Sequence, residues 1–536
     1  MTLFQNHLLS VILFTPTVGA LLLLFIGKER DNAIRWIANI FGVLGFLVSL
    51  PLWFRYQPQG AAWQFVEHAD WIPAIGATYF LGVDGFSMLL VLLTTLMGLI
   101  AILSSWTAIT ERVKEFYIFM LVLQTGMIGA FVSLDFLLFF LFWEVMLVPM
   151  YFLIGIWGGG RRLYSAIKFF LYTLVGSVVM LLGILALYFY VYTATGVYTF
   201  DITQFQQLTI PSNVQKWIFL AFFLGFAVKV PMFPFHTWLP DAHTDAPTAG
   251  SVILAAVLLK MGTYGFLRFA LPLFPDALER FLPLLSILAL IGIIYGGLMA
   301  LIQKDIKSLV AYSSVSHMGL IMLAVFSLNP EGVQGAIYQM LNHGLSTGAL
   351  FLIVGILYER SPTRLIKDFG GVSSQMPVFS AFFLVCLLSS VGLPGLNGFV
   401  GEILCLFGIF KTSQLQAILA VSTVILAAAY LLWMYQRVMH GPITNEKIRS
   451  FKDMNKRELG YLVPIIIMMF WMGIYPQTFL RKMDASVSRL LDRVHNREKI
   501  FLRESGRTTS LKNDMAAERD PDRTANEVPS VLEEKR

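Results

Sequence analysis

The sequence predicts an all-α polytopic membrane protein with about fourteen transmembrane helices. Of its 536 residues, 57% are hydrophobic and only 13% are charged, whereas about a quarter of the residues are charged in a soluble globular chain. The mean hydropathy is +0.71. Long apolar runs alternate with short charged clusters, which is the pattern of a chain that crosses a bilayer many times.

The predicted spans follow from the rule that about twenty mostly apolar residues cross the hydrocarbon core. The first run, from Leu8 to Ile26, lacks the basic start and the small-residue cleavage site of a signal peptide, so we interpret it as the first span. The spans are centred near Leu21, Leu44, Leu93, Val122, Leu141, Val179, Phe222, Val257, Leu290, Leu320, Leu350, Leu387, Leu426 and Ile467.

Basic residues gather in alternate loops. The loops after odd-numbered spans carry clusters such as Arg161 and Arg162, whereas those after even-numbered spans carry few basic residues. Because positively charged loops stay on the cytoplasmic side, both termini are predicted to lie on the outer side of the membrane. The same loops account for the net charge of +6. The sequence has no soluble basic face with interleaved aromatic residues, so it does not indicate nucleic-acid binding.

Helix-breaking residues interrupt two spans. The seventh runs into Pro231, Pro234 and Pro240, and the twelfth contains the stretch Gly392–Gly398. A packing kink explains one such break equally well, but the two breaks lie five spans apart. An odd offset means that the two segments enter the membrane from opposite faces. Spans four to eight and nine to thirteen are therefore predicted to form two inverted-topology five-helix repeats, each containing a broken helix, as in ion-coupled transporters.

This organisation divides the chain into five segments. The last is a polar tail, for which we expect a short amphipathic continuation to about Phe501 and then disorder. The predicted segments are residues 1–110, with spans one to three; 111–271, the first repeat with broken helix seven; 272–440, the inverted second repeat with broken helix twelve; 441–480, the last span; and 481–536, the tail.

Several ionisable residues are predicted to lie within the membrane, where a charge costs at least about 2.5–3.5 kcal/mol and marks a functional candidate. A lysine or glutamate in mid-helix cannot extend its charge to the surface, whereas a lone buried histidine is as often a satisfied core residue. Burial can tune lysine and glutamate to exchange protons near neutral pH, and histidine needs the least tuning. The candidates are Glu144, Lys229, Lys260, His317, His343 and Glu402.

These residue types favour a proton path, in which Glu144 and Lys229 form a hypothetical charge-pair switch. Sodium is the alternative ion, but it favours clustered oxygen ligands, and a lysine-centred path is a poor site for it. No Walker loop or Gly-x-Gly-x-x-Gly motif opens a helix. The two cysteines, Cys386 and Cys405, cannot by themselves hold an iron–sulfur cluster or a zinc ion. We therefore expect no cofactor or metal in this chain, and an energy source outside it.

At the motif level the chain resembles the antiporter-like subunits of respiratory complex I. The broken helix and its continuation, KVPMFPFHTWLPDAHTDAPTAGS from Lys229 to Ser251, closely match the signature of that family. Further matches are Phe142-Trp143-Glu144, Lys304–Gly319 and Leu393–Glu402, and the resemblance extends from about Gly82 to Pro476. At residue 402 the chain has the glutamate of one branch of the family, whereas sister subunits carry lysine there.

The resemblance implies a proton-translocating membrane-arm subunit of NADH:quinone oxidoreductase, in the inner membrane of a bacterium. NADH, FMN, iron–sulfur clusters and quinone are then expected in partner subunits, with sister antiporter-like subunits on either side and lipid around them. The alternative is a subunit of an Mrp-type cation/proton antiporter or of a membrane-bound hydrogenase, since these relatives share most of the motifs. A membrane scaffold is disfavoured by the intramembrane charges.

Particular roles also follow from the resemblance. Glu144 and Lys229 would form the charge pair of one half-channel, and Lys260 would be the central relay. His317 and His343 would carry the connection, together with water. Glu402 would be the terminal proton donor or acceptor.

Overall fold

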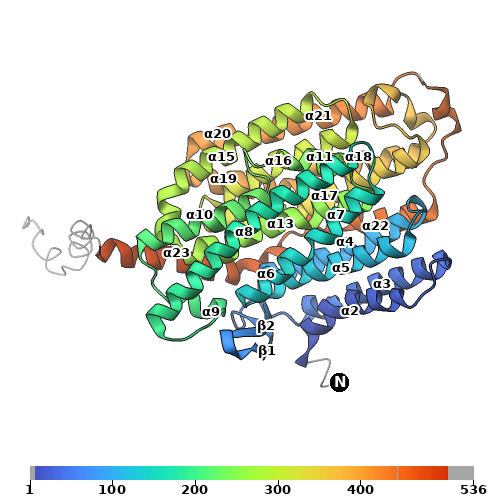
Figure 1. Ribbon diagram of the computed structural model, residues 1–536. Coiled ribbons are helices and arrows are strands. Elements are labelled where there is room, and N and C mark those ends of the chain that lie inside the picture. The colour runs from blue at the N-terminus through green and yellow to red at the C-terminus, as the bar shows by residue number, and fades with distance from the viewer. Residues whose placement is uncertain (1–5, 444, 505–536) are drawn as a thin grey trace, which may run out of the picture.

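The computed structural model describes residues 6–443 and 445–504. The sequence predicts disorder after about Phe501, and nearly all of that tail, from residue 505 on, lies outside these residues. Helices dominate the described chain and lie roughly side by side in one bundle (Figure 1).

The first half contains α2 (Leu8–Leu24), α3 (Asp31–Arg55), α4 (Gly85–Ala108), α5 (Val113–Val132), α6 (Phe136–Val145), α7 (Leu147–Trp157), α8 (Arg162–Thr195), α9 (Ile202–Phe205), α10 (Ser212–Lys229), α11 (Trp238–Asp245), α12 (Thr248–Ile253), α13 (Leu259–Gly265) and α14 (Leu271–Leu273), with π-helical turns η2 (Leu254–Leu258) and η3 (Phe266–Ala270) joining the last three.

The second half contains α15 (Pro275–Leu301), α16 (Ile306–Val325), α17 (Pro330–Arg360), α18 (Pro377–Val391), α19 (Asn397–Thr412), α20 (Gln414–Ala420), α21 (Ser422–Met439), α22 (Lys456–Ile474) and α23 (Gln477–Glu504). Short 3₁₀ turns are η1 (Pro73–Ile75), η4 (Ile366–Asp368), η5 (Val372–Ser374) and η6 (Glu446–Ser450).

Within the described residues, eleven helices are long and apolar enough to cross a membrane, and Leu8–Leu24 and Pro377–Val391 are shorter apolar helices. Many of the spanning helices expose large apolar side chains on their outer faces, as a lipid-facing surface requires. The prediction of a helical polytopic membrane protein is therefore confirmed.

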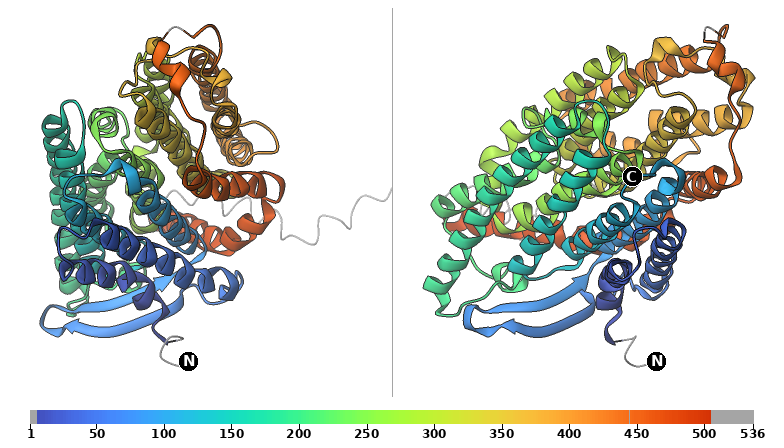
Figure 2. Two further views of the ribbon diagram at one scale, coloured as in Figure 1. Left: turned by 90° about the vertical axis from the view of Figure 1, so that its right-hand side faces the viewer. Right: turned by 45° about the vertical axis from the view of Figure 1, so that its right-hand side comes forward.

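The prediction that the chain is entirely helical was wrong in one place. Strands β1 (Gln64–Ile72) and β2 (Ala77–Val83) form an antiparallel hairpin between α3 and α4 (Figure 2). The hairpin turns at Pro73–Gly76, and Gly76 adopts a φ of 67°, which favours glycine. Aromatic and β-branched residues on both sides of this turn are typical of strands.

The connecting segments gather at two opposite ends of the bundle. At the hairpin end, the β1–β2 hairpin meets the start of α6, where the Thr78 amide donates to Asp135 Oδ2 at 2.9 Å. At the other end, called here the basic end, Lys114 Nζ donates to the Leu24 carbonyl at 2.8 Å, and Arg364 Nε pairs with Asp305 at 3.1 Å. The contacts at the basic end thus join loops that follow odd-numbered spans, which are the loops rich in basic residues.

Helix α23 is the amphipathic continuation that the sequence predicts after the last span. It buries Met483, Val487 and Leu491 against the bundle, one side chain per helical turn. Lys482 Nζ donates to the Trp53 carbonyl at 2.9 Å, and the Gly85 amide donates to Ser486 Oγ at 2.9 Å. These contacts hold α23 across the hairpin end of the molecule (Figure 1).

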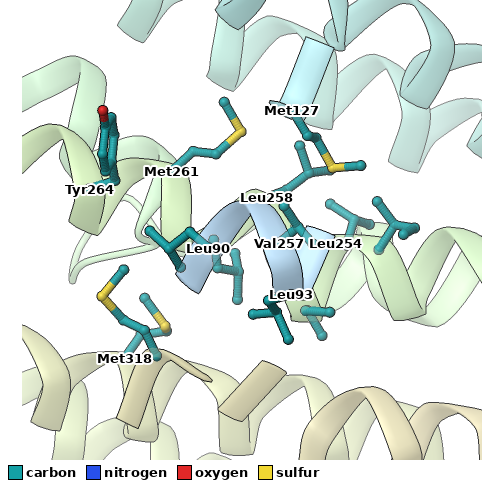
Figure 3. Close-up of a cluster of buried hydrophobic side chains, with 14 of the residues drawn as sticks. Leu90, Leu93, Met127, Leu254, Val257, Leu258, Met261, Tyr264 and Met318 are labelled. Atoms are coloured by element: carbon teal, nitrogen blue, oxygen red, sulfur yellow. The ribbon is translucent and has the colours of Figure 1, made fainter. Parts of the chain in front are cut away.

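The segment Thr248–Leu273 occupies the centre of the molecule, and its apolar window is completely buried. Figure 3 shows Leu90 and Leu93 of α4, Met127 of α5 and Met318 of α16 packed around Leu254, Val257, Leu258 and Met261. This apolar jacket keeps lipid away from the central segment. Polar groups on that segment must therefore find partners within the protein.

Candidate functional site

Glu144 and Lys229 lie near each other without forming an ion pair. Glu144 is in α6 and Lys229 is the last residue of α10. The two charges interact electrostatically, but no contact within 4 Å joins them. Glu144 Oε1 and Lys229 Nζ are both buried and lack a hydrogen-bond partner. The ammonium instead lies 5.2 Å from the ring centroid of Trp143, the neighbour of Glu144, at a distance suited to a cation–π contact.

The chain breaks directly after Lys229, as the prolines predict. Helix α10 ends there, and the chain turns through Pro231 and Pro234 before α11 begins at Trp238. The Trp238 indole donates to the freed Val228 carbonyl at 2.9 Å. Membrane-buried backbone groups need such replacement partners, so the broken segment is stabilised by protein contacts.

Lys260 lies in α13, directly after the π-helical turn η2, and has no exposed surface. Its ammonium contacts two groups, the Ala255 carbonyl and His343 Nδ1, the latter at 2.6 Å. A Cβ on Gly262 would come within 2.6 Å of the Val230 side chain, so α13 packs directly against the end of α10. Lys229 and Lys260 are therefore on neighbouring elements. Short π-helical turns are frequent at functional sites.

His317 of α16 and His343 of α17 face each other at the centre. Their ring centroids are 5.9 Å apart, and both rings are at least 98% buried. The Nε2 atom of each ring has no hydrogen-bond partner. Two buried imidazoles with open positions, beside a buried ammonium, make a set of groups that can exchange protons.

A polar stripe on α17 connects this centre to Glu402. Gln339, Asn342, His343 and Ser346 are spaced three and four residues apart, so they share one face of the helix. Gln339 Nε2 donates to Glu402 Oε1 at 3.4 Å, and Asn342 Nδ2 donates to Gln339 Oε1 at 2.9 Å. His343 contacts Lys260 from the same face. Lys260 and Glu402 are thus the ends of one buried polar series.

Glu402 lies in the first turns of α19, after the second predicted break. Helix α18 ends at Val391, and Gly392 closes it with a φ of +83°. A Cβ on Gly392 would lie 2.3 Å from Glu402 Oε2. Gly392 therefore serves two needs, a left-handed turn and direct backbone approach to the carboxylate.

We expect Gly392→Ala to reduce the proton transport implied by the resemblance several-fold, because the new methyl group displaces the Glu402 carboxylate. Gly395→Ala is the matched control, since Gly395 has a similar φ of +93° but no atom within 4 Å of its Cβ position. Proton uptake into membrane vesicles measures the effect of both variants. Equal losses in the two variants would assign the effect to backbone strain and contradict a role for the Glu402 position.

Two further buried residues at this site were not among the candidates. His243 of α11 has no exposed surface, its ring nitrogens lack partners, and it stacks on Phe351 at 4.6 Å. Lys307 of α16 is 5% exposed and its ammonium donates to the Ala246 carbonyl. His243 interacts electrostatically with both Lys307 and Lys260. In the sequence, Lys307 lies among the basic residues of a loop, so the sequence alone does not indicate that its side chain is buried.

Lys307 also lines a cavity of about 390 Å³ at the basic end, together with Thr107, Glu359 and Arg364. A cavity of this size with polar walls holds several water molecules, since one needs only about 10–15 Å³ measured in this way. Lys307 therefore borders a cavity large enough for water, and His243 interacts electrostatically with Lys307 and with Lys260.

No group of three or more His, Cys, Asp or Glu side chains suited to a metal ion occurs in residues 6–443 and 445–504. Cys386 and Cys405 are free and buried.

Comparison with known proteins places this geometry in a family. The profile of the transmembrane region of NADH:quinone oxidoreductase and Mrp antiporter subunits matches residues 133–427, which include all six candidate residues. The chain belongs to this family. It is an antiporter-like membrane subunit, and the region that matches the family extends from just before α6 into α21.

Curated relatives of the antiporter-like chain have closely similar lengths. NADH-quinone oxidoreductase subunit M of Rhodobacter capsulatus is 47% identical over 503 residues, which cover 92% of this chain and 98% of that protein. Subunit M of Rickettsia prowazekii is 44% identical, covering 90% and 98%. NADH-ubiquinone oxidoreductase chain 4 of Arabidopsis thaliana is 45% identical, covering 90% and 97%. The identification as a subunit M-type antiporter-like protein of respiratory complex I is therefore confirmed.

Solved structures agree with this assignment. A chain of respiratory complex I from Thermus thermophilus with bound NADH superimposes with a TM-score of 0.83 at 32% identity, covering 91% of this chain and 99% of that one. A chain of the Mrp complex from Dietzia sp. DQ12-45-1b reaches a TM-score of 0.79 at 20% identity, covering 92% and 98%. The second similarity establishes a shared fold only, so NADH:quinone oxidoreductase fits better than the Mrp alternative.

Proposed function

We propose that this antiporter-like subunit moves protons through the membrane along Glu144, Lys229, Lys260, the pair His317 and His343, and Glu402. The energy comes from redox chemistry in other subunits of NADH:quinone oxidoreductase. The subunit acts as a translocase and holds no redox centre of its own. NADH, FMN, iron–sulfur clusters and quinone belong to its partners.

The observation that carries this proposal is the contact between Lys260 Nζ and His343 Nδ1 at 2.6 Å in a completely buried position. An ammonium and an imidazole joined by one hydrogen bond can pass a proton without further movement of the backbone. His317 extends the pair on one side, and the polar stripe of α17 extends it to Glu402.

Protons reach this centre from the basic end. The cavity of about 390 Å³ admits water as far as Lys307. His243 interacts electrostatically with both Lys307 and Lys260, and its open ring nitrogens can accept and release a proton. We assign His243 and Lys307 to this entry route in addition to the six residues of the main path.

Glu144 and Lys229 act as a switch on the first half of the path. In the present arrangement Lys229 Nζ and Glu144 Oε1 lack hydrogen-bond partners, whereas Ser177 hydrogen-bonds the Glu144 carboxylate, and the two charges are near enough to interact. Closer approach would hold the lysine in its charged form, and separation would favour release of its proton. Partly satisfied buried charges of this kind have two competing arrangements, which is what a switch requires.

We further infer fourteen spans, because α2, α3, α4 and α22 flank two groups of five. The groups extend from α5 to α14 and from α15 to α21, and the fourth member of each is broken, after Lys229 and at Gly392–Leu396. This supports inverted-topology repeats over residues 111–271 and 272–440, flanked by 1–110, 441–480 and the tail 481–536. Both termini then lie on the periplasmic side of a bacterial inner membrane, with sister antiporter-like subunits on either side and lipid around them.

Deletion of this chain tests the proposal against the Mrp-type alternative. In inverted membrane vesicles, loss of the chain should abolish or reduce NADH-driven proton uptake, and a plasmid-borne copy should restore it. A sodium gradient should drive no proton exchange that depends on this chain. Chain-dependent sodium/proton exchange without NADH would instead support the antiporter alternative.

A further inference from the structure

The central helix carries a second polar series that leads away from the proton path, toward the hairpin end. Lys260, Tyr264 and Arg268 are spaced four residues apart, so they follow one face of the segment Thr248–Leu273. Tyr264 stands at the edge of the apolar jacket around this segment (Figure 3). All three residues are at least 95% buried. The proposed path from Lys260 to Glu402 does not use Tyr264 or Arg268.

Arg268 is held rigidly at the end of this series. Its Nη2 atom pairs with Asp84 Oδ1 at 2.8 Å, and the two side chains are only 6% and 7% exposed. The guanidinium carbon lies 4.3 Å from the ring centroid of Phe86 and 4.4 Å from that of Trp63. Asp84 is fixed in turn as the N-cap of α4. A planar cation between two rings, paired with a fixed carboxylate, has little freedom to move.

The hydrogen bonds around Tyr264 run in a direction that stops a proton relay. The Tyr264 hydroxyl donates to the Phe131 carbonyl at 3.1 Å, and its oxygen accepts from Arg268 Nε at 3.1 Å. Each member of a relay must accept one proton and donate another. A guanidinium offers only donors and does not give up its proton in proteins. Arg268 therefore cannot pass a proton onward along this series. Its positive charge also repels an approaching proton.

Helix α23 adds more positive charge beyond Arg268. Arg489 and Arg493 line a cavity of about 20 Å³ next to Asp84 and Arg268, which is room for about one water molecule. Burial, together with the charges of Arg268 and Arg489, lowers the pKa of Arg493, whereas Asp84 opposes this shift. Three guanidinium groups and one carboxylate thus line this small cavity beside Arg268.

We propose that the Asp84–Arg268 pair is a proton seal between Lys260 and the hairpin end, and that Arg489 and Arg493 reinforce it. The seal prevents Lys260 from exchanging protons with both sides of the membrane at once. Fixed cationic groups exclude protons from other water-accessible pores in this way. The proposal rests on the proposed role of Lys260 as a proton carrier.

The test is the passive proton permeability of the whole complex in liposomes, without NADH, under a potassium diffusion potential with valinomycin. Asp84→Asn/Arg268→Gln removes both charges together, because removal of one alone would leave an unpaired buried charge. We expect its proton leak to exceed that of the wild type by roughly tenfold, equivalent to about 1.4 kcal/mol of lost barrier. Glu279→Gln/Arg280→Gln, which removes one exposed acid and one exposed arginine from α15, should not change the leak.

Assembly of each variant is checked on native gels. Arg489→Gln/Arg493→Gln should raise the leak to a smaller extent, and it decides the question if the first variant does not assemble. An unchanged leak in assembled variants overturns the seal. Adding Lys260→Ala to the leaking variant should suppress the leak. A leak that persists without Lys260 would show that the leaking protons do not pass through Lys260, which overturns the seal. The role of Lys260 in pumping is tested separately by Lys260→Ala alone.

Discussion

Glu144→Gln is expected to lower NADH-driven proton uptake at least roughly tenfold while the complex still assembles. Glutamine keeps the size of the side chain but cannot hold a negative charge. Lys229 would then lose the only carboxylate that acts on it electrostatically among the described residues. Since Lys229 is 98% buried without a hydrogen-bond partner, its proton affinity would no longer depend on the state of residue 144.

Proton uptake and NADH:quinone turnover in inverted vesicles measure this effect, with assembly followed on native gels. Glu144→Asp restores the charge on a shorter side chain and should recover part of the activity. Glu111→Gln, in the exposed segment before α5, is the control for removal of one carboxylate. Full pumping by an assembled Glu144→Gln complex would contradict the switch.

The sequence alone was sufficient to predict much of the fold and the main candidates. The helix breaks are encoded locally, since several prolines follow Lys229 within a few residues and Gly392 is followed directly by further breakers, Pro394 and Gly395. Charged residues in long apolar runs are equally visible, and the structure brings Lys260, His317 and His343 together as a group. Periodicity and composition do not reveal which of these side chains touch.

The remaining features depend on contacts between distant parts of the chain. The β1–β2 hairpin lies in a stretch too short and too mixed to stand out beside apolar spans. Lys307 resembles other loop lysines in the sequence, although it is buried in the fold. His243 becomes a candidate only because it interacts electrostatically with both Lys307 and Lys260. The pairing of Asp84 with Arg268 joins residues 184 positions apart in the numbering, so no local pattern indicates it.

Lys260→Ala is expected to have the largest effect of any single change. The substitution removes the ammonium that contacts His343 Nδ1 and the Ala255 carbonyl, and it leaves the imidazole without its proton donor or acceptor. Because the segment is completely buried, a displaced side chain or loosely held water does not reproduce this geometry. We expect proton uptake to fall at least roughly tenfold, with coupled quinone reduction falling alongside it.

The most direct test of the proton path is therefore simultaneous measurement of NADH-driven quinone reduction and proton uptake in native membranes with Lys260→Ala. Lys28→Ala, in the exposed loop after α2, is the control, and native gels establish assembly. Loss of pumping or of coupled turnover in a fully assembled complex is the predicted result. Wild-type pumping without Lys260 would contradict the path, and it would leave Lys260 as a structural charge.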